Sequence, residues 1–243
     1  MPAPPRLFIH LHIPKTAGSW ARQHLLEPNF DPDAVLWADR GARGLPALIR
    51  AIRSKRRAGH ERVLVTGHLA FGLHRFVALP CTYLVLLREP VERAASEYYF
   101  VRDVRVQGRP HPDHALAKRL DFASFTKRPA YRDVQSRMLA GLGWHALSAR
   151  RRGGPIETAL RRRSHATLRR PDVVVGVQEN LEAFRDALTG RAGLTRATDG
   201  PTINTTPYRP RGVHLEREHR AAVQTHHRLD LALYREAVRR LTA

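Results

Sequence analysis

Residues 7–19 read LFIHLHIPKTAGS and combine a strand, a turn and the first residues of a helix. Apolar side chains at positions 7, 9, 11 and 13 alternate with Phe8, His10 and His12, which predicts a β-strand with one apolar face. The small residues of segment 14–19 predict a tight turn, and a helical pattern follows. Such a turn suits phosphate-like oxyanions, because backbone N–H groups point outward at the positive end of the helix.

The side chains of this turn also suit an anion. Lys15 supplies a mobile positive charge, and the hydroxyls of Thr16 and Ser19 can donate hydrogen bonds to anionic oxygens. The turn is not a Walker A loop, in which the lysine follows the last glycine, because Lys15 precedes Gly18. The chain has only four lysines, so a lysine here indicates function. The alternative is an ordinary surface turn that contains a lysine.

Strands and helices alternate along the rest of the chain. Apolar runs predict strands at residues 62–66, 82–87 and 172–177, and periodic patterns predict helices at residues 45–57, 90–102, 180–188 and 216–241, the last with a break near 224–227. This order predicts an α/β fold of three layers, with a central, mainly parallel sheet flanked by helices, in a single domain of residues 1–243. Ligands of such sheets bind beyond the carboxyl ends of the strands.

A second candidate anion site follows the predicted strand 82–87. Residues 86–99 read LLREPVERAASEYY, so Arg88 emerges at the strand end and Ser96 lies about two turns into the next helix. A guanidinium fork together with a hydroxyl suits a terminal phosphate. The alternative for Arg88 is a salt bridge with Glu89 or Glu92. The Tyr98–Tyr99 pair is interpreted as core packing.

A histidine follows the predicted strand 62–66. Residues 65–71 read VTGHLAF and place His68 just past the strand end, where it faces the presumed site. Histidine titrates near neutral pH and can take the proton of an attacking hydroxyl. The alternative for any one of the 14 histidines is a structural role, and His10 and His12 are interpreted in that way because no further ligand residues complete a metal site.

These segments together resemble carbohydrate sulfotransferases that use 3'-phosphoadenosine 5'-phosphosulfate (PAPS), particularly the heparan sulfate 2-O-sulfotransferase-like branch and its soluble bacterial relatives. The resemblance implies a P-loop-like fold and metal-free transfer of a sulfuryl group from PAPS to a hydroxyl or amine. It implies Lys15 and His68 as catalytic residues, the latter as the base. The cofactor-binding residues that it implies are Lys15, Thr16, Ala17, Gly18, Ser19, Arg88, Ser96, Asn204, Thr205 and Arg209.

The chain departs from that family at two positions. Thr66 stands where the family has a second histidine, and Trp20 stands where hydroxyl residues are common. Residues 202–209 resemble the loop that closes over the nucleotide in the family. Residues 135–141 also resemble bacterial members, either as a wall of the acceptor cleft or as a packed helix.

The net charge of +20 and the pI near 11.4 indicate either an anionic partner or a compositional bias, because nearly all the positive charge is arginine. Two rival functions are a P-loop nucleotide kinase or NTPase and a basic nucleic-acid binder. The first would need a strand-end aspartate for Mg²⁺, which the predicted strands do not offer. The second would use arginine clusters such as 53–57 and 161–163, but no recognised nucleic-acid motif and no specific nucleic-acid partner is apparent.

The single cysteine and the lack of a long apolar run predict a cytoplasmic protein. The single cysteine, Cys81, cannot form an internal disulfide, and no apolar run approaches the ~20 residues that cross a bilayer. A carbohydrate is the acceptor that the resemblance implies, while lipid, peptide tyrosine and small metabolite stay open. The sequence does not reveal the oligomeric state.

Overall fold

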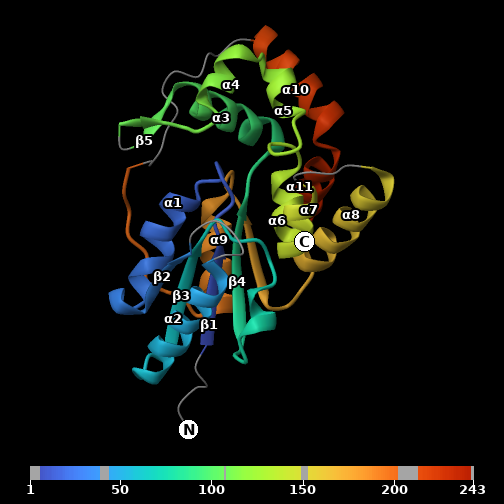
Figure 1. The fold of residues 1–243 in the computed structure, drawn as a ribbon. Helices are drawn as coiled ribbons and strands as arrows, with labels where there is room; N and C mark the ends of the chain where they lie inside the picture. Colours follow the sequence, from blue (N-terminus) through green and yellow to red (C-terminus); the bar gives the residue numbers. More distant parts are fainter. Residues whose placement is uncertain (1–5, 39–43, 107, 149–152, 202–212, 242–243) are drawn as a thin grey trace.

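The computed structural model describes residues 6–38, 44–106, 108–148, 153–201 and 213–241. Its centre is a five-stranded sheet in the order β2-β3-β1-β4-β7 (Figure 1). The strands are β1 (Arg6–Leu11), β2 (Val35–Ala38), β3 (Arg62–Gly67), β4 (Cys81–Leu87) and β7 (Val173–Val177). Every pair is parallel, so all five carboxyl ends lie at one edge of the sheet. The predicted α/β fold is confirmed.

The alternation in the first strand sets the two faces of the sheet. Leu7, Ile9 and Leu11 belong to one apolar core and Phe8 belongs to another. The first core is covered by α2 (Leu45–Arg57), α6 (Val134–Ala140), α8 (Gly154–Leu168) and α11 (Arg228–Leu241). The second is covered by α1 (Gly18–Ala21), the π-helical turn η1 (Arg22–Leu26) and α9 (Leu181–Ala187), followed by η6 (Leu188–Ala192). Each fully buried leucine or isoleucine stabilises this arrangement by roughly 1.5–3 kcal/mol.

A third apolar cluster lies above the carboxyl edge of the sheet. It joins α3 (Pro90–Asp103), α4 (His114–Arg119), α5 (Phe122–Thr126) and α10 (Val213–His226), the green and red helices at the top of Figure 1. Tyr98 and Tyr99 are buried in it, and the Tyr98 hydroxyl donates to the Leu120 carbonyl. The prediction that this tyrosine pair is core packing is therefore confirmed. None of the described helices is long and apolar enough to cross a membrane.

Four local features differ from the sequence prediction. Strand β2 was not predicted, because it has only four residues at the sheet edge and its Trp37 is half-exposed. The small hairpin of β5 (Arg105–Val106) and β6 (Arg109–Pro110) after α3 was also not predicted. Helix α7 (Leu142–Ser148), which contains Gly143, was likewise not predicted. The first helical segment is an α-helical turn that continues as a π-helical one.

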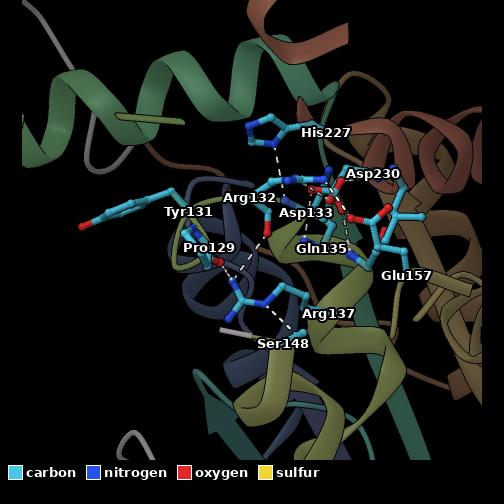
Figure 2. Close-up of polar contacts among 12 residues, drawn as sticks. Pro129, Tyr131, Arg132, Asp133, Gln135, Arg137, Ser148, Glu157, His227 and Asp230 are labelled. Carbon is cyan, nitrogen blue, oxygen red and sulfur yellow. Dashed lines mark hydrogen bonds and ion pairs between the residues drawn. The ribbon is translucent and has the colours of Figure 1, made fainter. Parts of the chain in front are cut away.

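The predicted break in the last helix lies at His227, and two aspartates fix it in place (Figure 2). Asp133 Oδ1 accepts hydrogen bonds from the N–H groups of Leu229 and Asp230, at 3.1 and 3.2 Å. Asp230 in turn accepts from the N–H groups of Gln135 and Ser136, at 3.3 and 2.8 Å. The two helices α6 and α11 therefore cap each other's N-termini in the protein interior.

Replacing Asp230 tests this mutual cap. Asp230→Ala leaves two buried N–H groups of α6 without an acceptor, so we expect the free energy of unfolding to fall by about 2 kcal/mol. Urea denaturation measures this, with Glu182→Ala on the exposed surface of α9 as the matched carboxylate control. Equal stability of both variants would contradict the capping role.

The same cluster has the spacing of a metal site. Ligand atoms of Asp133, His227 and Asp230 lie within 4.8 Å of one another. Both carboxylates already accept backbone N–H groups, which explains their burial without an ion. We therefore expect a chelator to leave the midpoint of urea unfolding unchanged, whereas a clear destabilisation by the chelator would show that the cluster holds a metal.

Candidate functional site

The turn after β1 has an unusual backbone conformation. Lys15 and Ala17 both have positive φ angles, 65° and 58°, in the left-handed region that non-glycine residues seldom occupy. The buried Thr16 hydroxyl donates to the Ile13 carbonyl at 3.0 Å and holds the turn from inside. A backbone strained in this way persists only where the surrounding structure holds it in that conformation, and such strain is concentrated at ligand sites. Turns with such dihedral angles make concave arrays of N–H groups that bind anions.

Gly18 lets this turn approach the first strand closely. A Cβ atom at this position would lie 2.4 Å from Cδ2 of His12, far inside van der Waals contact. The His12 ring therefore lies directly against the first residue of α1. Any other residue at position 18 would push the turn away from the strand.

Arg88 connects the turn after β1 with the end of β4. Its Nη1 donates to the carbonyl oxygen of Lys15 at 3.2 Å, although the two residues are 73 positions apart in the chain. Its Nη2 lies 3.5 Å from Glu92 Oε2, so the ion pair considered from the sequence also forms. The two predicted anion-binding segments thus meet at the carboxyl edge of the sheet.

Gln135 fixes the backbone of Arg88, a contact that the sequence did not reveal. The buried Gln135 amide accepts from Arg88 N–H at 2.9 Å and donates to the Arg88 carbonyl at 3.0 Å. The backbone N–H of Gln135 is itself held by Asp230 (Figure 2). The sequence left segment 135–141 open as either a packed helix or a wall of the acceptor cleft. Gln135 packs in the interior, whereas Arg137 and Met138 line a cavity.

The Lys15 side chain extends toward α3. Its Nζ lies 4.0 Å from the centre of the Phe100 ring, a cation–π distance. The pKa of Lys15 is lowered to about 8, chiefly by burial; the charge of Glu97 opposes this shift and the charge of Arg88 adds to it. Lys15 is thus a cation held in a poorly solvated place beside another cation, an arrangement that an incoming anion would relieve.

The pKa of Lys15 can be measured directly, because the chain has only four lysines. We expect one ¹³Cε signal of ¹³C-lysine-labelled protein to titrate near pH 8 and to disappear in Lys15→Arg. In Glu97→Gln the same signal should titrate at lower pH, because a charge that favours the ammonium form is lost. A Lys15 signal that titrates near 10.5 would contradict the burial of this cation.

His68 follows β3 and has one ring nitrogen fixed by the neighbouring strand. Its Nδ1 lies 2.8 Å from the His12 carbonyl oxygen, and because a carbonyl can only accept, Nδ1 carries the proton. In the neutral ring, Nε2 is then the nitrogen that can accept a proton. On the other side of β3, Gly67 permits the close approach of β2, since a Cβ there would lie 2.2 Å from the Ala38 carbonyl oxygen.

The histidine next to His68 comes from β1. The His12 and His68 rings stack with their centres 4.7 Å apart. Thr66, which stands where the family has a second histidine, instead accepts or donates a 2.9 Å hydrogen bond with the buried His10. His12 is therefore part of the candidate site, although the sequence alone favoured a purely structural role for it. The sequence could have indicated this, because His12 and His68 both lie close to the ends of two predicted parallel strands.

A cavity of about 860 Å³ opens beside His68. Pro14 of the turn, His68 and Glu97 line it on the side of the candidate site. Most of the rest of its described lining comes from β2, α2, α6 and α7, and further lining residues lie at positions 69, 70 and 76 after β3 and at 111, 113, 130 and 131. A molecule in this cavity would therefore lie next to both the candidate base and the Lys15 turn.

The other predicted nucleotide contacts are distributed as follows. Ser96 is buried on α3, two turns from Arg88, and Ser19 is half-buried at the start of α1. Asn204, Thr205 and Arg209 lie outside the described residues. The indole of Trp20, the position where the family often has a hydroxyl, donates to the Gly200 carbonyl at 3.1 Å.

No family model matches the sequence, and no curated protein matches it. Among solved structures, mouse sulfotransferase SULT7A1 complexed with PAP is similar, with a TM-score of 0.41 and 14% identity over 89% of this chain and 64% of that one. Retinol dehydratase in a complex with retinol and PAP has a TM-score of 0.37 and 12% identity, over 93% and 82% of the two chains. The chain thus spans about 64% of the length of the mouse enzyme. These likenesses are distant and do not assign the chain to a family.

Proposed function

We propose that the chain transfers a sulfuryl group from PAPS to a hydroxyl or amine of an acceptor. The observation that supports this most is the contact between Arg88 and the Lys15 carbonyl, which unites two anion-binding segments in one place. PAPS carries an anionic group at each end of its sugar, and two cationic positions at one sheet edge suit such a ligand. The location at the carboxyl ends of parallel strands is where nucleotides bind in α/β folds.

The proposed reaction is an in-line displacement. The acceptor oxygen forms a bond to sulfur while the bond between sulfur and the bridging phosphate oxygen breaks, and 3'-phosphoadenosine 5'-phosphate (PAP) leaves. His68 Nε2 takes the acceptor proton, because Nδ1 is already protonated against the His12 carbonyl. Lys15 and the N–H groups of the turn neutralise the charge that develops on the departing phosphate.

The nucleotide is anchored at its other end. Arg88 and Ser96 are assigned to the 3'-phosphate, and Thr16, Ala17, Gly18 and Ser19 to the cradle of the 5'-phosphosulfate. Asn204, Thr205 and Arg209 stay predicted contacts to the nucleotide. The carboxylate of Glu97 raises the pKa of Lys15 and so favours its charged form for this role.

Two variants separate binding from chemistry. Arg88→Ala removes a charge-assisted contact worth about 1.5–3 kcal/mol, so we expect its Kd for PAP in calorimetry to rise 10- to 100-fold. His68→Ala should bind PAP within twofold of the wild type but turn over 10²–10⁴ times more slowly. Arg119→Ala, an exposed arginine on α4, is the control for loss of one positive charge. Normal turnover of His68→Ala would rule out His68 as the base.

The kinase or NTPase alternative is tested with ligands alone. We expect PAP to raise the melting temperature of the wild type more than ATP with Mg²⁺ at the same concentration. A larger shift with ATP and Mg²⁺ would favour the rival function. Affinity for duplex DNA that exceeds that for PAP at physiological salt would favour the nucleic-acid binder instead.

A further inference from the structure

The cavity beside His68 differs in chemistry from the rest of this strongly basic chain. Its walls are mostly alkyl and aromatic side chains, contributed by separate elements. They are Leu36, Trp37 and Ala38 of β2, Leu45, Ala47, Leu48 and Ala51 of α2, and Val134, Met138, Leu142 and Ala146 of α6 and α7. Trp37 also contacts the histidine stack, since its ring packs edge-on against His12 with centres 6.2 Å apart.

We propose that the acceptor is an uncharged, largely apolar alcohol or phenol, whose hydrocarbon part fills this cavity and whose hydroxyl lies at His68. The inference rests on the proposed sulfuryl transfer and names its substrate class. It favours an apolar acceptor over the carbohydrate that the sequence resemblance implied. Apolar lining with a few convergent polar groups at one end is the usual chemistry of a small-molecule site.

The charges around the cavity support this choice. Its charged lining residues, among the described part of the chain, are Glu97, Asp113 and Arg137. Arg137 is buried, and its guanidinium donates to the carbonyls of Pro129 and Ala130 at 2.7 and 2.9 Å (Figure 2). A polyanionic glycan needs exposed cations along its binding surface, yet this protein of net charge +20 places none of its described exposed cations in the cavity wall.

The guanidinium of Arg137 and the carboxylate of Asp113 already have hydrogen-bond partners within the protein, and His145 is uncharged. Arg137 also bonds Ser148 Oγ and the His145 carbonyl, at 3.2 and 3.3 Å. Burial and the charge of Arg137 lower the pKa of His145 to about 4, so its ring is uncharged at neutral pH. The Tyr131 hydroxyl donates a hydrogen bond to the Asp113 carboxylate. The described part of the wall therefore offers little to a charged ligand and a large apolar area to a hydrocarbon.

The size of the cavity also fits such an acceptor. About 860 Å³ is ample for a fused ring system or an alkylphenol and lies within the ordinary range for small-molecule sites. Small residues create this room, among them Ala47 and Ala51 on one side and Gly143 and Ala146 on the other. Because Ala47 and Ala51 are one turn apart on α2, a bulky residue at either would project into the cavity.

The test uses 4-octylphenol as the probe and a sulfated, uronate-containing disaccharide as the competitor class. We expect calorimetry to show 1:1 binding of 4-octylphenol to the wild type and no binding of the disaccharide. Ala51→Trp, and Ala146→Phe on the opposite wall, should weaken octylphenol binding at least tenfold and leave the Kd for PAP within twofold. Ala166→Trp on the exposed side of α8 is the control for a bulky substitution.

The outcomes separate this inference from the proposed function. Octylphenol binding that the cavity variants weaken, together with normal PAP binding, supports the inference. The same octylphenol binding without any PAP binding would overturn the proposed function and the acceptor role with it, and would leave only a site for an apolar ligand. Tighter binding of the disaccharide, or octylphenol binding that neither variant changes, overturns the inference. If PAP binds normally in that case, the proposed sulfuryl transfer still stands, but its acceptor belongs to another chemical class.

Discussion

The hydrogen bond from Arg88 to the Lys15 carbonyl is the contact on which the candidate site depends. It ties the turn after β1 to the end of β4, and these strands are neighbours in the parallel sheet. The site holds the Lys15 ammonium in a poorly solvated place, and burial is the main cause of its lowered pKa, to which the Arg88 guanidinium adds. The fold holds them together through a second set of contacts, in which Gln135 brackets the Arg88 backbone and Asp230 holds Gln135.

This arrangement places strain and stability in different parts of the molecule. The turn carries two left-handed residues and a buried lysine, each unfavourable for folding. The two apolar cores and the mutual caps of α6 and α11 supply the stability that keeps the turn in its shape. Conformational strain that is maintained by the surrounding structure is common at binding sites, because it pre-organises groups for a ligand.

Much of the fold could be predicted from local patterns. The alternation in residues 7–13 gave both faces of β1, and the break at His227 was visible as an interruption of helical periodicity. Strand β2 escaped prediction because four edge residues carry too little periodicity. A parallel sheet places Lys15 and Arg88 at the same edge, as the sequence predicted, but the strand order that makes β1 and β4 neighbours was not predicted.

The contacts between distant segments were not predictable in the same way. Gln135 meets Arg88 across 47 residues and Asp230 across 95, and no local pattern encodes such pairings. The cavity has the same origin, since its walls come from many elements that are separate in sequence. His12 is an intermediate case, because its place beside His68 follows once the two strands are known to be neighbours.

The central claim is that the Lys15 turn and Arg88 hold opposite ends of one nucleotide. Calorimetric affinities of PAP, 5'-AMP and 3'-AMP for the wild type, Lys15→Ala and Arg88→Ala test it as a cycle of protein and ligand deletions. We expect loss of the 3'-phosphate to weaken binding to the wild type and Lys15→Ala clearly more than binding to Arg88→Ala. Loss of the 5'-phosphate should weaken binding to the wild type and Arg88→Ala clearly more than binding to Lys15→Ala. Equal losses in all three proteins would contradict it.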